Sequence, residues 1–393
     1  MNKRFIVSLL CVVCTIIICV ALMSGCSSSK RQSGSLDSND SITRTEDSTA
    51  MPEIAVLETP MNMKDGNTVI VRSYGARNRL PFMVDEENRL WLWGSIFREG
   101  IDTTESSKPR VIMEDVADAR VGYESIVILK TDGSVLYWDE MNDINTMHEK
   151  REFAPEKIYE GAAKVRMDIS IPYIITPDGM LIEYYNHKLT EIMENVEDIS
   201  SGTSSTLIIT KDGELYVMGG NDYGQLGLGS KDYDMHREPV YVTSGVKRVA
   251  AGGSTSYFVN DDGTLYGCGI NYHFQISESE CEYVPEFVEI MDKVRDISAS
   301  ENGLLILSED NCLYMRGIND TCVDESIIGS DWAQAQNTKI ADGVISVCAA
   351  SGYGIMMKED GKLYSWGQNY RGDLGCGSEG YYAAPTEIKF GAK

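Results

Sequence analysis

The glycines near the end of the chain form the first pattern that could do chemistry. The stretch Ile355–Ser378 reads IMMKEDGKLYSWGQNYRGDLGCGS, and the backbone around Gly372, Gly375 and Gly377 could cradle a phosphate. A phosphate loop is completed by a following helix, whose N-terminal amides attract the anion, and by a closing Lys-Ser or Lys-Thr pair. The sequence after these glycines shows neither feature. We therefore interpret them as a structural turn and not as a nucleotide site.

Residue types that catalyse reactions or bind metals form no recognisable constellation. Neither a Gly-x-Ser-x-Gly elbow nor an Asp-x-Asp-x-Asp-Gly calcium loop occurs. Most carboxylates fall in turns, where Asp has a structural reason to lie. We expect no catalytic residue, no metal and no cofactor, although two acids brought together from distant segments could form a hydrolase or lyase site. The four histidines stand apart, without metal-type pairing: His148, His187, His236 and His273.

Cysteine usage is uneven along the chain. Three of the ten cysteines precede Cys26, and the other six lie toward the C-terminus. No Cys-x-x-Cys pair occurs among these six, which argues against zinc. Their even number permits disulfides in an oxidising compartment, and free thiols are the alternative. The six are Cys268, Cys281, Cys312, Cys322, Cys348 and Cys376.

An acidic turn followed by an apolar and aromatic run recurs along most of the chain. Seven copies follow one another at steps of 34 to 50 residues, which is typical of repeat architectures. In each copy, β-branched and aromatic residues lead into and out of the turn, which predicts a β-hairpin. The turn acids are Glu87, Asp132, Asp178, Asp212, Asp262, Asp310 and Asp360. Five of them precede a turn glycine: Gly133, Gly179, Gly213, Gly263 and Gly361.

Each hairpin is followed by two further strand signals. Most copies carry a proline two or three residues before Val or Ile, as at Pro239, and proline is tolerated at a strand start. A fourth segment, such as VKRVAAGG at Val246–Gly253, leads into the next hairpin. Four strands per repeat without helical periodicity predict an all-β fold. We expect a seven-bladed β-propeller with four strands per blade over residues 67–393.

One position, six residues after the turn acid, is predicted to pack between neighbouring sheets. It is apolar or aromatic in six copies, as expected for a residue between two sheets. Arg316 is the exception, and it predicts a locally polar or irregular blade. The residues at this position are Trp93, Trp138, Tyr184, Met218, Cys268, Arg316 and Trp366.

The two ends of the repeat region complement each other. The last hairpin is followed by a third-strand signal at Pro385–Phe390 but by no fourth strand. Thr68–Val84 supplies a fourth strand before the first hairpin. We therefore predict that the N- and C-termini share one blade, which would remove exposed sheet edges.

The N-terminus reads as a secretion signal. Asn2-Lys3-Arg4 is basic, Phe5–Met23 is apolar, and Cys26 follows a Ser-Gly pair. This pattern resembles a bacterial lipoprotein signal, in which the Cys is lipidated and becomes the new N-terminus. We expect residues 1–25 to be the signal peptide and Cys26 to be the lipidation site. An uncleaved anchor is the alternative, since a 19-residue apolar run can span a bilayer.

A polar segment separates this signal from the repeats. Residues 26–66 are rich in Ser, Thr, Asp and Asn and lack apolar periodicity, which predicts a flexible tether. About 40 residues of such coil span roughly 35 Å. Both readings of the signal place the propeller on the outer face of the bacterial cytoplasmic membrane or in the cell envelope. The lipid anchor would be its only membrane contact.

The repeats resemble those of the regulator-of-chromosome-condensation family. The resemblance is carried by VAAGGSTSYFVNDDGTLYGCGIN from Val249 and by the loop NDYGQLGLGS at Asn221–Ser230. The glycine loop recurs after Gly367, and the copy at Asp178 lacks it. The resemblance extends from about Thr68 to the C-terminus and implies a seven-bladed propeller. The family's nucleotide-exchange activity on a small GTPase is not expected, because a domain outside the cell would not meet that partner.

The long loops after each hairpin are the predicted binding face. Chain direction puts them opposite the short Asp-Gly turns, and long loops on a rigid scaffold commonly carry recognition. Their aromatic residues suit interface contacts or stacking on sugars, although any single one could instead pin its loop. The set comprises Tyr223, Tyr233, Tyr272, Phe274, Tyr283, Trp332, Tyr370, Tyr381 and Tyr382.

The sequence therefore predicts a membrane-tethered binding module that is not a catalyst. Its formal charge of −25 argues against nucleic acid and against binding of anionic lipid by the propeller. We expect a monomer that holds an extracellular protein or a glycan. Secreted bacterial propellers of similar repeat type include an inhibitor of β-lactamase, so an inhibitor of an extracellular enzyme is one alternative. A polysaccharide hydrolase or lyase is the other.

Overall fold

The computed structural model divides the chain into two compact units, Met1–Met51 and Pro52–Lys393, and every described residue belongs to the second. The described residues are 71–77, 80–94, 108–122, 125–139, 153–168, 170–319, 333–369, 372–376 and 380–390. The predicted signal peptide, Cys26, and the tether at residues 26–66 lie outside them. In the part of the chain that is described, no helix is long and apolar enough to cross a membrane.

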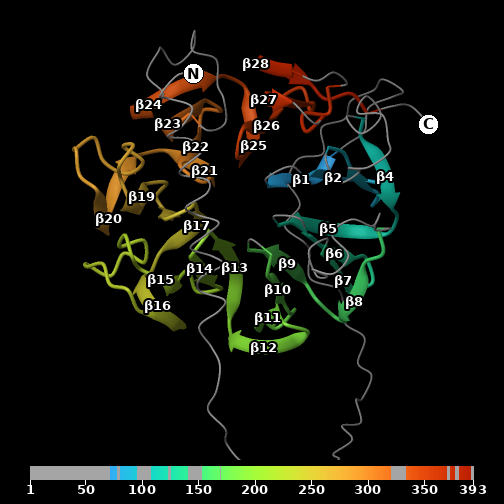
Figure 1. The fold of residues 1–393 in the computed structure, drawn as a ribbon, viewed down its shortest axis with the longest axis horizontal. Helices are drawn as coiled ribbons and strands as arrows, with labels where there is room; N and C mark the ends of the chain where they lie inside the picture. Colours follow the sequence, from blue (N-terminus) through green and yellow to red (C-terminus); the bar gives the residue numbers. More distant parts are fainter. Residues whose placement is uncertain are drawn as a thin grey trace, which may run out of the picture. The chain divides into compact units, whose positions relative to one another are not determined.

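All regular elements in the described residues are β-strands, and they form seven four-stranded antiparallel sheets. The sheets are arranged as blades around a common centre, with the first strand of each blade innermost (Figure 1). Neighbouring innermost strands contact one another, and β1 contacts β25, so the ring is closed. The all-β, seven-bladed propeller with four strands per blade is therefore confirmed.

The strands of each blade follow one another along the chain. Blade 1 holds β1 (Val71–Arg77), β2 (Leu80–Asp85), β3 (Leu90–Leu92) and β4 (Arg110–Met113). Blade 2 holds β5 (Val116–Val121), β6 (Ser125–Lys130), β7 (Val135–Asp139) and β8 (Glu156–Tyr159). Blade 3 holds β9 (Lys164–Met167), β10 (Pro172–Ile175), β11 (Leu181–Tyr185) and β12 (Lys188–Met193). Blade 4 holds β13 (Val196–Ser201), β14 (Ser205–Thr210), β15 (Leu215–Gly220) and β16 (Met235–Thr243).

The last three blades continue the same order. Blade 5 holds β17 (Val246–Ala251), β18 (Thr255–Asn260), β19 (Leu265–Ile270) and β20 (Tyr283–Met291). Blade 6 holds β21 (Val294–Ala299), β22 (Gly303–Ser308), β23 (Leu313–Ile318) and β24 (Ala333–Ala341). Blade 7 holds β25 (Val344–Ala350), β26 (Tyr353–Lys358), β27 (Leu363–Asn369) and β28 (Gly380–Glu387).

The prediction that the two termini share one blade is wrong. β1 pairs with β2 in blade 1, and β28 pairs with β27 in blade 7, so each of these sheets is built from one end of the chain. The segment that the repeats present as a fourth strand is in fact the innermost strand of the following blade. Each sheet therefore combines one such segment with the hairpin and third strand that follow it. Seven complete sheets result without any strand exchange.

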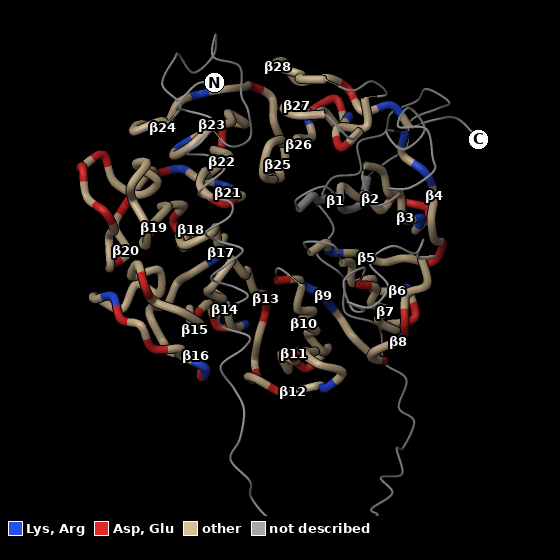
Figure 2. Tube along the Cα trace, viewed as in Figure 1, with Lys and Arg blue, Asp and Glu red and all other residues tan. Residues whose placement is uncertain are grey.

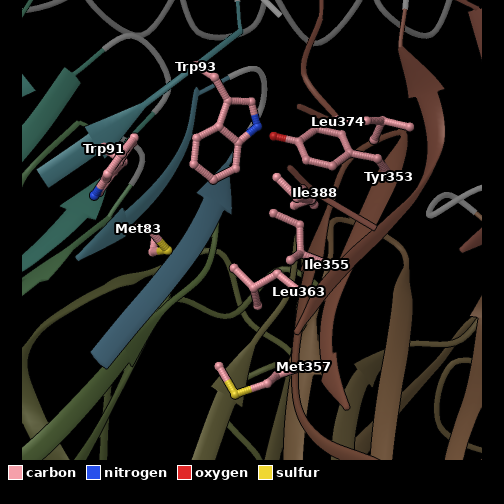
Figure 3. Close-up of a cluster of buried hydrophobic side chains, with 10 residues drawn as sticks. Met83, Trp91, Trp93, Tyr353, Ile355, Met357, Leu363, Leu374 and Ile388 are labelled. Carbon is pink, nitrogen blue, oxygen red and sulfur yellow. The ribbon is translucent and has the colours of Figure 1, made fainter. Parts of the chain in front are cut away.

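Side chains between blades 1 and 7 close the ring instead. Trp93, Met83 and Trp91 from blade 1 pack against Tyr353, Ile355, Met357 and Leu363 from blade 7 (Figure 3). The Trp93 indole Nε1 donates a hydrogen bond to the backbone O of Asp373, at 3.0 Å. Phe390 adds edge-on ring contacts to both tryptophans, at 5.7 and 6.1 Å between centroids. Apolar packing and one hydrogen bond thus join the two ends of the repeat region.

The Asp-Gly turns lie between the second and third strands of their blades, as the turn at Asp262 illustrates. The Asp262 carboxylate accepts hydrogen bonds from the Thr264 backbone N, at 2.9 Å, and hydroxyl, at 2.7 Å, which lower its pKa. Gly263 has φ of +87°, and its backbone O accepts a hydrogen bond from Val294 N of the next blade, at 2.8 Å. The turn therefore shapes its hairpin and ties it to a neighbour. Equivalent places are occupied by Asp132, Gly133, Asp178, Gly179, Asp212, Gly213, Asp360 and Gly361.

The innermost strands add ion pairs between blades. Arg166 on β9 contacts Asp198 on β13, with Nε and Oδ1 2.6 Å apart. Burial alone would raise the pKa of Asp198, but the neighbouring guanidinium outweighs it and holds that pKa below its usual value. The pair therefore joins blades 3 and 4 at the centre of the ring.

Arg316 is the irregular residue that its sequence position predicted. It is only 4% exposed, and its Nη1 donates to Asn337 Oδ1 at 3.2 Å, while its Nε has no hydrogen-bond partner. Burial lowers the pKa of this guanidinium. The equivalent Cys268 donates through Sγ to the backbone O of Gln225 in the preceding blade, at 3.5 Å. Blade 6 thus holds a buried cation where the blade before it holds a small thiol.

Candidate binding face

The loops between the third and fourth strands of blades 4 and 5 share one internal scaffold. In the loop after β15, Asn221 Oδ1 accepts a hydrogen bond from Leu226 N at 3.1 Å. In the loop after β19, Asn271 Oδ1 accepts the equivalent bond from Ile276 N at 2.8 Å. Because each Asn is fully buried, its amide fixes the loop from within. The loops are therefore well-defined supports for the side chains that they carry.

The glycine loop of blade 4 also docks onto blade 5. Gly229 N donates a hydrogen bond to the backbone O of Pro285, at 3.0 Å. A Cβ added at Gly224 would lie 2.6 Å from the Pro285 Cα, well inside van der Waals contact. The glycine therefore permits close approach of one blade to the next. In blade 7, Gly372 and Gly375 correspond to Gly224 and Gly227, and Gly375 N donates to Gly372 O at 3.1 Å as Gly227 N donates to Gly224 O at 3.0 Å. Gly377 lies outside the described residues.

An exposed aromatic surface lies where these two loops meet. The rings of Tyr223 and Tyr272 touch edge to face, with centroids 6.4 Å apart and planes at 77°. Lys231 Nζ lies 4.5 Å from the centroid of the Tyr283 ring. Tyr272 is 49% exposed and Tyr233 is 82% exposed. We call these five residues, Tyr223, Lys231, Tyr233, Tyr272 and Tyr283, the blade 4–5 patch.

Charged neighbours act on this patch. Desolvation, Glu282 and Tyr223 raise the pKa of Tyr272, while Lys231 lowers it. Glu282 and Lys231 therefore lie close enough to Tyr272 to affect its ionisation. The phenol stays neutral at physiological pH, so the patch presents tyrosine as a hydrogen-bonding aromatic and not as an anion.

A His-Asp-Asn chain holds the segment that carries Lys231 and Tyr233. Asp232 Oδ2 accepts a hydrogen bond from Asn221 Nδ2 at 2.7 Å, and Asp232 Oδ1 lies 3.0 Å from His236 Nε2. The hydrogen bond from Asn221 lowers the pKa of Asp232, and the contact with His236 lowers it further. Desolvation acts in the opposite direction but is outweighed. This carboxylate therefore ties the end of the loop to its beginning.

The remaining predicted aromatics differ in position and exposure. Phe274 is partly buried in the loop after β19 and has a left-handed backbone, with φ of +61°. Tyr381 and Tyr382 lie on β28 in blade 7, and Tyr381 is 52% exposed. Trp332 and Tyr370 lie outside the described residues. Among the described residues, the ring contacts bring predicted residues of two blades together at blades 4 and 5.

The prolines are expected to mark the start of the last strand in each blade, but in three blades this strand begins a few residues before the proline. Pro239, Pro285 and Pro385 lie inside β16, β20 and β28, so Tyr283, Tyr381 and Tyr382 are strand residues and not loop residues. These strands are the outermost of their sheets. Proline has no backbone N–H to donate, and on the free edge of a sheet no neighbouring strand requires one. Lys231 belongs to no pattern that predicts a binding residue, and it joins the patch by its contact with Tyr283.

The described residues contain neither a metal-binding cluster nor a disulfide. No group of three or more His, Cys, Asp or Glu side chains there could hold a metal ion. Five of the predicted C-terminal cysteines take part in no disulfide, and Cys322 lies outside the described part. These five are Cys268, Cys281, Cys312, Cys348 and Cys376.

Comparison with known proteins identifies the repeats. The family described as Regulator of chromosome condensation (RCC1) repeat matches residues 212–259 and 360–393, and a second description of the same repeat matches residues 196–225 and 246–275. The chain contains RCC1 repeats. The matched segments include the glycine loops of blades 4 and 7, so the blade 4 loop that carries Tyr223, Lys231 and Tyr233 is of the RCC1 type.

Individual relatives agree with this result. An RCC1 repeat-containing protein of Dictyostelium discoideum is 27% identical over 241 residues, which cover 54% of this chain and 48% of that protein. The match thus spans about half of that relative's length. Human WBSCR16 superimposes with a TM-score of 0.62 at 18% identity, over 72% of this chain and 85% of that one. Prp20p of Saccharomyces cerevisiae superimposes with a TM-score of 0.50 at 22% identity, over 81% of this chain and 77% of that one. These structural likenesses show the fold alone.

Proposed function

We propose that this protein is a tethered binding module that presents the blade 4–5 patch to a protein partner outside the cytoplasmic membrane. Cys26 would carry the lipid anchor, and residues 26–66 would let the propeller stand off the membrane. The partner would bind across the two loops that support the patch. RCC1-repeat propellers are regulators and binding proteins rather than catalysts, which supports a binding role.

The exposure of the patch carries this proposal. Tyr233 and Tyr272 are exposed, although large aromatic side chains normally gain free energy by burial. The loops beneath them are fixed by buried Asn side chains and by the contact with Pro285, so little ordering remains to be done on binding. Tyrosine on a rigid support is enriched among the residues that dominate interface affinity.

Two observations favour a protein over a glycan. The rings of Tyr223 and Tyr272 stand 77° apart, so together they offer no flat platform for a sugar ring. Prp20p, which shares the fold, is described as binding Gsp1p and histones, and both are proteins. We therefore expect the partner surface to be a folded or extended polypeptide.

Capture of the partner should depend on the patch. We expect the full chain to recover one specific protein from the native cell surface after crosslinking, as read by mass spectrometry. The double variant Tyr223→Ala, Tyr272→Ala should lose most of that protein, because it removes two contacting interface rings. Tyr185→Ala is the matched control, since Tyr185 on β11 is also 49% exposed but lies in blade 3. Recovery of the same partner by the double variant would refute the proposed face.

Attachment should depend on Cys26. If this residue is the lipid site, Cys26→Ser abolishes incorporation of labelled fatty acid and blocks removal of residues 1–25. Metabolic labelling followed by N-terminal mass spectrometry measures both effects. A mature protein that retains Asn2, or lipid found elsewhere on the chain, would exclude attachment through Cys26.

A further inference from the structure

The two loop segments that carry the blade 4–5 patch are rich in acidic residues. The two loop segments that frame it, residues 221–234 and 271–286, contain seven Asp or Glu residues and a single Lys or Arg, which is Lys231. Figure 2 shows acidic positions along the loop between β19 and β20. Six of the seven carboxylates are exposed and available to a partner: Asp222, Asp234, Glu278, Glu280, Glu282 and Glu286.

One tyrosine of the patch already contacts a cation within the chain. Lys231 Nζ lies over the Tyr283 ring at 4.5 Å, within the range in which the ring quadrupole attracts a positive charge. Glu282, next to Tyr283 in the chain, also affects the ionisation of Tyr272. An acid and an aromatic ring therefore lie together at the junction of the two loops. That combination suits ammonium and guanidinium groups, which pair with the acid and pack against the ring.

We propose that the blade 4–5 patch binds a Lys- and Arg-rich segment of the partner protein. This inference rests on the proposed function and adds the chemistry of the partner. The rings of Tyr233 and Tyr272 take the cationic side chains. Glu278, Glu280 and Glu282 then supply the neutralising charges.

Charge excludes the competing occupants. An acidic peptide or a nucleic acid would be repelled by the same carboxylates and by the chain's net charge of −25. A neutral peptide would gain the aromatic contacts but would leave the exposed carboxylates unpaired. The complementary arrangement also accelerates encounter with a basic partner, and this effect weakens as salt is added.

The proposal is tested with a peptide of defined chemistry. The full chain is titrated with a fluorescent peptide of alternating Arg and Ser, and with the same peptide carrying Glu in place of Arg. We expect saturable binding of the Arg peptide only. Tyr272→Ala should weaken that binding about fivefold through loss of one cation–π contact at the interface. The double variant Glu280→Gln, Glu282→Gln should weaken it and flatten its salt dependence.

Matched controls decide the outcome. Tyr185→Ala removes an equally exposed tyrosine, and Glu191→Gln removes an exposed acid on β12, so both should bind the peptide like the parent chain. Unchanged affinity in the patch variants, or equal loss in the controls, would overturn the basic-segment proposal. If the crosslinked partner still depends on Tyr223 and Tyr272, the proposed function survives that result. If the Tyr223→Ala, Tyr272→Ala variant captures the crosslinked partner as well as the parent chain does, the proposed function itself is refuted.

Discussion

Replacing Trp93 with alanine is expected to lower the free energy of unfolding by about 4 kcal/mol. Trp93 is fully buried between blades 1 and 7, where it faces Tyr353 (Figure 3). Its indole also contacts Phe390 and donates a hydrogen bond to Asp373 O. Because no described strand crosses between these blades, this packing, with the contact of β1 and β25, closes the ring. Equilibrium denaturant unfolding followed by circular dichroism measures the loss.

Two further variants separate the causes. Trp93→Phe keeps most of the apolar contact but removes the bond to Asp373, so we expect a loss of about 1 to 3 kcal/mol. Tyr381→Ala alters a half-exposed ring on β28 and should change stability by no more than about 0.5 kcal/mol. A loss below about 1 kcal/mol for Trp93→Ala would show that the blade 1–7 contact does not control closure.

The sequence predicts most of the fold because the hairpin signal is local. Within the turn, Asp262 accepts a hydrogen bond from the backbone N of Thr264, and Gly263 N donates to Asn260 O, so the signal lies within a few neighbouring residues and spacing alone reveals it. The sequence does not show where one blade ends and the next begins. The segment Val246–Ala251 lies between the third strand of one repeat and the hairpin of the next, and sequence order alone does not say which of these two neighbours it pairs with. In the structure it pairs with the hairpin that follows it. The shared-blade prediction failed on that choice.

The candidate site was less predictable than the fold. Residue type and loop length together predict exposed aromatic residues, and this pattern identifies Tyr223, Tyr233 and Tyr272. The contact between Tyr223 and Tyr272 depends on how far the blade 4 loop reaches across blade 5, which no local spacing encodes. Lys231 joins the patch for the same reason, since its partner Tyr283 lies on the outer strand of the next blade.

The reach of that loop can be tested at Gly224. We expect Gly224→Ala to lower the free energy of unfolding by about 3 kcal/mol. The backbone there has φ of +72°, which costs an alanine about 1 kcal/mol. The added Cβ would also lie 2.6 Å from the Pro285 Cα, so the two blades must separate; overpacking of this kind typically costs about 1 to 3 kcal/mol. Thermal and denaturant melts of the full chain measure the sum.

A matched glycine isolates the contact between the blades. Gly161 has a similar φ of +77°, but a Cβ added there meets no atom within 4 Å. Gly161→Ala should therefore cost only the backbone term, about 1 kcal/mol, and should leave partner capture unchanged. Gly224→Ala should reduce partner capture as well as stability, because the shifted loop carries Tyr223 away from Tyr272. Equal losses of stability in the two variants would mean that the approach to Pro285 is relieved without cost, and that the patch does not depend on it.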